Sequence, residues 1–132
     1  MVYDMYQENI LDHYQNPRNL GRLDAADVVA KEHNPLCGDT IELFLKLDGD
    51  QRVADVRFQG HGCAISQSSI SMLTEELKGK RVEELEALAN KEHIFELLGV
   101  PISHARIKCA LLSMDVLLLA LKDLGAKPAP GA

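Results

Sequence analysis

A hairpin in the middle of the chain constrains its fold most strongly. Apolar and polar residues alternate over residues 41–47 and again over residues 53–58, which is the period of a half-buried strand. The sequence Asp-Gly-Asp at 48–50 lies between the two runs and is a strong turn signal. The sequence therefore predicts an antiparallel pair of strands with one apolar face that other elements must cover.

Helical patterns flank this hairpin and provide that cover. Apolar residues recur there at three- and four-residue spacing, which is typical of helices that pack through one face. The final helix is apolar on nearly every side and is expected to be largely buried. A short strand over residues 28–30 is expected ahead of the hairpin. The order predicts an α+β domain: a small three-stranded antiparallel sheet with an N-terminal helix and several C-terminal helices packed against it. The expected helices span residues 3–14, 64–77, 82–88, 94–98 and 105–124.

The length, composition and net charge of the chain limit the classes of protein to which it can belong. A chain of 132 residues that is 46% hydrophobic suits one domain, expected over residues 1–126, with a loose Pro- and Ala-rich tail over 127–132. A formal net charge of −6 argues against nucleic acid as the main partner. The apolar stretches are far shorter than the roughly 20 residues that a membrane span needs. We therefore expect a soluble, cytoplasmic protein with no membrane partner.

Three cysteines, Cys37, Cys63 and Cys109, stand in contexts that favour a shared site. An odd number of cysteines in a reducing compartment argues against a disulfide framework. The sequence has no CxxC pair, which excludes a zinc ribbon and a thioredoxin motif. Each thiol is then a buried apolar residue, a metal ligand or a reactive nucleophile.

Cys37 and Asp39 share a turn that comes directly before the first hairpin strand. Pro35 and Gly38 flank Cys37, and a Pro/Gly turn is not a usual place for a core cysteine. A thiolate and a carboxylate two positions apart can face one cation. Alternatively, Asp39 caps the turn through a backbone hydrogen bond.

Cys63 and Cys109 each lie where a predicted helix begins. Cys63 follows a sharp turn at 60–63, and the unpaired N–H groups and partial positive charge of the helix N-terminus favour a thiolate there. Gly60 and Gly62 would let a cluster or another protein approach the backbone. Two basic residues precede Cys109 and also favour a thiolate, and the alternative for this cysteine is an apolar helix residue.

Together these residues predict one exposed site, formed by three separate element ends, at which Cys37, Asp39, Cys63 and Cys109 converge. Soft thiolates select zinc, copper(I) or iron–sulfur clusters. A carboxylate in the fourth position makes such a site more labile than a structural zinc site with four Cys or His ligands. The histidines show no comparable pattern and are interpreted as solvated surface residues: His13, His33, His61, His93 and His104.

At four segments the chain resembles the U-type scaffold family of iron–sulfur cluster assembly, which comprises IscU, SufU and the N-terminal domain of NifU. The resemblance runs from the N-terminal helix to about Leu124 and keeps the order of the family's motifs. The segments are residues 13–19, residues 34–39 with Cys-Gly-Asp, residues 58–66 with Gly-Cys-Ala-Ile-Ser, and residues 106–112 with Lys-Cys-Ala-Leu-Leu.

This resemblance implies a scaffold that receives sulfur from a cysteine desulfurase and iron from a donor. The scaffold builds a [2Fe–2S] cluster and passes it to acceptor apoproteins, so that it is a carrier and not an enzyme. By position, Cys37, Cys63 and Cys109 match the family's ligand cysteines, and Asp39 matches the aspartate that makes the cluster labile. Zinc often occupies the same site in isolated members, and a homodimer is compatible with the family.

Lys108 separates the chain from the IscU branch, which places a histidine immediately before the third cysteine. In this respect the chain resembles the SufU branch, some of whose members are zinc-dependent sulfur acceptors, although residues 82–103 are too short for that branch's insertion. Since a protonated lysine does not ligate, Asp39 or a second subunit must supply the fourth ligand. The alternative function is a zinc-bound sulfurtransferase in which a thiolate, most readily Cys109, attacks the persulfide of the desulfurase.

Overall fold

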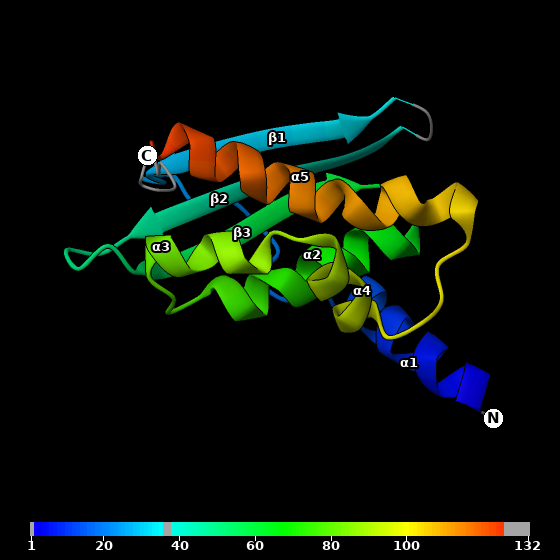
Figure 1. Cartoon of the computed structure of the whole chain (residues 1–132). Coiled ribbons are helices and arrows are strands. Elements are labelled where there is room, and N and C mark those ends of the chain that lie inside the picture. The colour runs from blue at the N-terminus through cyan, green and yellow to red at the C-terminus, as the bar shows by residue number, and fades with distance from the viewer. Residues whose placement is uncertain (1, 36–37, 126–132) are drawn as a thin grey trace.

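A computed structural model of the chain describes the backbone of residues 2–35 and 38–125, and the side chains of residues 8–35 and 38–125. The expected tail over 127–132 therefore lies outside the described residues. Three strands are followed by a set of helices in the described part (Figure 1). The elements are α1 (Val2–Gln15), β1 (Val28–Asn34), β2 (Asp39–Leu47), β3 (Val53–His61), α2 (Ala64–Leu77), α3 (Val82–Leu85), the 3-10 helix η1 (Glu86–Leu88), α4 (Lys91–Leu98), the 3-10 helix η2 (His104–Arg106) and α5 (Ile107–Asp123).

The sheet is antiparallel, with β2 in the centre between β1 and β3. This confirms the predicted three-stranded sheet, but all three strands are longer than the sequence predicted. β2 begins at Asp39, which was expected in the preceding turn, and β1 continues to Asn34, which pairs with Asp39. β3 continues to His61, which pairs with Thr40, so the expected turn at 60–63 is confined to Gly62 and Cys63. These extensions carry the sheet up to the candidate site residues.

Helices α2 and α5 cover one face of the sheet, and this contact forms the core (Figure 1). On the opposite face the β1 residue Val29 is 46% exposed. Phe44 also lies on that face but is buried, and the guanidinium of Arg22 lies 5.1 Å from its ring centroid, within the range of a cation–π contact. Helix α5 buries most of its apolar residues, as expected, while Leu118 is 43% exposed and Asp115 also faces solvent.

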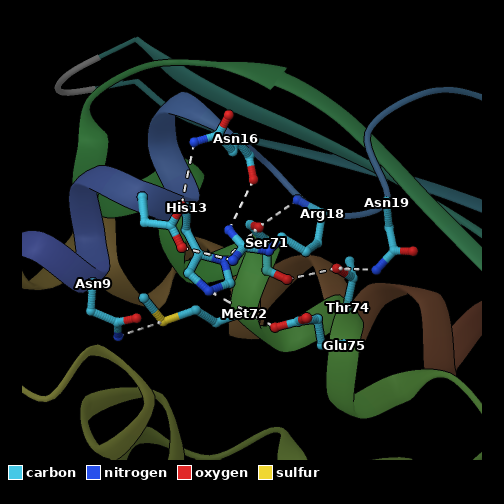
Figure 2. A network of polar contacts seen from close by, with 10 residues as sticks. Asn9, His13, Asn16, Arg18, Asn19, Ser71, Met72, Thr74 and Glu75 are labelled. Carbon is cyan, nitrogen blue, oxygen red and sulfur yellow. Dashed lines mark hydrogen bonds and ion pairs between the residues drawn. The ribbon is translucent and has the colours of Figure 1, made fainter.

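The end of α1 and the segment after it are joined to α2 by polar contacts (Figure 2). His13 Nδ1 lies 2.8 Å from Ser71 Oγ, and the same hydroxyl accepts a hydrogen bond from the backbone N–H of Arg18. Asn19 donates to Thr74 Oγ1 at 3.0 Å. The first of the four family segments, residues 13–19, thus helps to attach α1 to the core, to which the buried Ile10 of α1 also belongs.

The surface interpretation of the histidines was wrong for His13, which is 6% exposed. It was correct for His33, His61 and His104, which are exposed. His93 is half-buried and contacts the carboxylate of Glu76. Helical spacing alone did not reveal that His13 faces the buried serine of another helix.

Among the described helices, none has the length and apolar character that crossing a membrane requires.

His13 makes the docking of α1 dependent on pH. Burial, with a further contribution from the charge of Arg18, holds the pKa of His13 below its usual value. The native state therefore binds fewer protons than the unfolded chain, and stability falls as pH drops below the unfolded value of about 6.5. We expect the free energy of unfolding, measured by urea denaturation, to fall between about pH 7.5 and 5.5 more steeply in wild type than in His13→Gln. Equal losses in both proteins would contradict this role.

Candidate metal site

Three element ends meet at one end of the molecule, where β2, α2 and α5 begin (Figure 1). Asp39 is the first residue of β2, Cys63 is the N-cap of α2, and Cys109 lies in the first turn of α5. One carboxylate oxygen of Asp39 and the Sγ atoms of the two cysteines lie within 4.8 Å of one another. The structure thus brings together three of the four predicted site residues, while Cys37 lies outside the described residues.

The spacing of these atoms suits a single thiophilic metal ion. A tetrahedral site with zinc–sulfur bonds of about 2.3 Å separates its sulfur ligands by about 3.8 Å. The two sulfur atoms need to approach each other by about 1 Å at most to reach that geometry. Two thiols and one carboxylate also form a mixed soft and hard donor set of the kind that zinc and iron accept. The residues present therefore fit the kind of site that the sequence predicts.

The site is less exposed than the sequence predicted. Asp39 is 3% exposed and Cys109 is 4% exposed, whereas Cys63 is half-buried. Asp39 shares the apolar, helix-facing side of β2 with Ile41, and Cys109 belongs to the buried face of α5. Cys63 is therefore the most accessible of the three described ligand candidates.

Asp39 also holds the beginning of α2. The backbone N–H of Cys63 donates a hydrogen bond to Oδ2 of Asp39 at 3.3 Å. This bond satisfies a donor at the N-terminus of α2, where a carboxylate is favoured by the helix dipole. An ionised carboxylate has about four acceptor positions on its two oxygens. Capping of α2 and metal binding by Asp39 are therefore compatible.

The close approach of the Asp39 side chain requires glycine at position 62. A Cβ atom at position 62 would lie 2.4 Å from Cγ of Asp39 and 2.6 Å from Oδ1, and the φ angle of 149° also favours glycine. A Cβ atom at Gly60 would lie 2.3 Å from the carbonyl oxygen of Thr40. Groups of the chain itself therefore require glycine at both positions, while the approach of a cluster or another protein to this backbone stays a prediction.

Gln67 supports the site and was not found from the sequence. Its side-chain amide donates to the carbonyl of Thr40 at 3.4 Å and to Ser66 Oγ at 3.0 Å. Ser66 in turn donates to the carbonyl of Cys63. These bonds connect the first turn of α2 to the strand residue next to Asp39. The abundance of Ser and Thr in α2 was the available signal, but it did not reveal which of these residues face the site.

The end of α1 borders the surface next to the candidate metal site. Gly62 and Gln67 line a surface hollow together with residues from the end of α1 and from the segment that follows it. The remaining lining residues are Tyr14, Pro17, Leu20, Phe58, Gly60 and His61. The first family segment and the candidate site therefore adjoin one another.

Comparison with known proteins shows which family the chain belongs to. The chain matches the model of the NifU-like N terminal domain over residues 5–130. It is 43% identical over 129 residues to the zinc-dependent sulfurtransferase SufU of Bacillus subtilis (strain 168), with 86% of each chain covered. It is 34% identical over 125 residues to the iron–sulfur cluster assembly scaffold protein IscU of Escherichia coli (strain K12), with 92% of this chain and 95% of IscU covered.

Solved structures agree with these sequence matches. The crystal structure of the iron–sulfur cluster assembly scaffold protein for the SUF system from Fervidobacterium islandicum AW-1 is similar, with a TM-score of 0.75 and 33% identity. The similarity covers 86% of this chain and 94% of that one. The chain belongs to the NifU-like N-terminal domain family, the U-type scaffold family that it resembles in sequence.

The contact between Gly62 and Asp39 gives a direct test of the site. We expect Gly62→Ala to displace the carboxylate of Asp39 and to weaken zinc binding by at least about tenfold, as loss of groups around metal ligands usually does. Gly79→Ala is the matched control, because Gly79 also has a positive φ angle but nothing within 4 Å of its added Cβ atom. Competition with a chromogenic chelator measures both affinities. Equal zinc affinity in the two variants would contradict the positioning of Asp39 by Gly62.

Proposed function

We propose that this protein is a scaffold on which a [2Fe–2S] cluster is assembled from iron and desulfurase-derived sulfur and then transferred to acceptor apoproteins. The observation that carries the proposal is the group formed by Asp39, Cys63 and Cys109, whose ligand atoms lie within 4.8 Å of one another. Cys37 supplies the third thiolate. Relatives named as iron–sulfur cluster assembly scaffold proteins, including that of Escherichia coli, support the proposal. Iron and sulfide are the cargo in this account, and the partners are a cysteine desulfurase and the acceptor proteins.

The donor set suits a cargo that must be held and later released. Thiolates bind iron strongly, whereas a carboxylate is a harder base and the more readily replaced ligand. Asp39 is supported by the N–H of Cys63, so it keeps a hydrogen-bond partner when it leaves a metal. Cys63 is half-buried and is the most accessible residue of the described group. Retention by thiolates and release at the carboxylate follow from these properties.

Anaerobic reconstitution tests the proposal. With a cysteine desulfurase, cysteine and ferrous iron, we expect a visible chromophore and about two irons and two sulfides per site, as a [2Fe–2S] cluster requires. Cys63→Ser and Cys109→Ser should fail to retain the cluster. His61→Ala is the control, because His61 is exposed and lies two residues before Cys63. A chromophore that survives both cysteine substitutions would contradict the proposed ligands.

Asp39 should control how long the cluster is retained. We expect Asp39→Ala to slow cluster loss to a chelator under anaerobic conditions, because the weakest ligand is no longer available for exchange. Asp39→Asn separates the two roles, since its amide oxygen can still accept the hydrogen bond from Cys63 N–H. Decay of the visible absorption measures both variants against wild type. If Asp39→Ala loses its cluster faster than wild type, Asp39 has a different role.

A zinc-bound sulfurtransferase is the second candidate function. The name of the Bacillus subtilis relative and the lysine at position 108, where IscU-like members have histidine, favour it. In this case the thiols would hold zinc, and one of them would accept the terminal sulfur of the desulfurase persulfide as the desulfurase thiol leaves. Tightly retained zinc, no iron uptake and faster desulfurase turnover would support this function over the scaffold.

A further inference from the structure

A buried hydrogen bond crosses from α2 to α5 next to Cys109. The hydroxyls of Ser69 and Ser113 lie 2.6 Å apart, and Ser69 Oγ donates to the carbonyl of Ala110 at 3.1 Å. Either hydroxyl can donate to the other, Ser113 Oγ also lies 3.4 Å from the carbonyl of Ala110, and both serines are fully buried. Ala110 directly follows Cys109 in the sequence. The hydroxyl of one helix is thus attached to the backbone beside a candidate ligand of the other.

Packing alone does not explain this pair. Burial of a hydroxyl is unfavourable unless it is hydrogen-bonded, and apolar residues of the same shape would fill the space with similar stability. Hydrogen bonds differ from apolar contacts because they depend on direction, and they weaken steeply when the donor and acceptor are misaligned. The pair formed by Ser69 and Ser113 therefore favours one register of α5 against α2.

That register fixes the distance between two ligand candidates. Ser69 lies six residues after Cys63, which corresponds to about 9 Å along a regular helix. Because α2 is a continuous helix from Ala64 to Leu77, a fixed position of Ser69 also fixes the helix start that carries Cys63. On α5 the attachment point is the residue next to Cys109. A shift of either helix would change the separation of the two thiols.

We propose that Ser69 and Ser113 are positioning residues that set the separation of Cys63 and Cys109 and thereby the metal affinity of the site. This inference rests on the proposed function, since it requires that the group binds metal. Neither serine contacts the metal in this account. Their effect passes through the backbone of α5 and the axis of α2.

Ser68 provides a matched control in the same helix. It is fully buried like Ser69, but its hydroxyl donates to carbonyls of its own helix, those of Ala64 and Ile65. Ser68→Ala and Ser69→Ala therefore remove the same atom from neighbouring buried positions. They differ in whether the lost hydrogen bond crosses to α5.

The test uses the full chain with zinc and cobalt(II) as probes. We expect Ser69→Ala to bind zinc about tenfold more weakly than Ser68→Ala, in line with other groups that orient metal ligands. The visible spectrum of the cobalt-loaded protein, which reports coordination geometry, should change in Ser69→Ala and match wild type in Ser68→Ala. If Ser69→Ala does not fold, Ser113→Ala keeps the bond from Ser69 to Ala110 and should show the same changes to a smaller extent.

Equal zinc affinities and cobalt spectra that coincide with wild type in the serine variants would overturn the positioning role while leaving the metal site intact. Wild-type protein that binds neither zinc nor cobalt at the cysteines would instead contradict the proposed metal site itself, and this inference with it. The two failures are therefore distinguishable.

Discussion

The contact between the carboxylate of Asp39 and the beginning of α2 is the interaction on which the site depends. It joins the central strand to the helix that carries Cys63, through the hydrogen bond from the N–H of Cys63 and the close approach of Gly62. The sheet and α2 must both be in place before this contact exists. The ligand group is therefore a product of the complete fold, and cargo binding at these residues reports on the native state.

Much of the fold follows from sequence periodicity. The alternation of residues 41–47 and 53–58 predicted β2 and β3, and the Asp-Gly-Asp turn predicted their antiparallel pairing. These signals are local, so they can be interpreted without knowledge of tertiary contacts. The convergence of Asp39, Cys63 and Cys109 was also predicted. The glycine-rich turn context indicated Cys63, whereas Cys109 depended more on the family resemblance. The family resemblance joined these separate signals into one site.

Other features depend on groups that are distant in the sequence and could not be predicted from local patterns. His13 is buried because it meets Ser71, and Asp39 is buried because it packs against Gly62. The glycines were assigned to an approaching ligand since the sequence does not show which group fills the space. In each case a tertiary contact that the sequence does not show decided the environment of the residue.

X-ray absorption at the zinc edge of the zinc-loaded protein tests the convergence of these ligands most directly. The account predicts one zinc per chain, with about three sulfur ligands near 2.3 Å and one lighter ligand. The sulfur number should fall by about one in Cys63→Ser and again by about one in the double variant that also carries Cys109→Ser. A zinc shell without sulfur, or a sulfur number that these substitutions leave unchanged, would contradict the site described here.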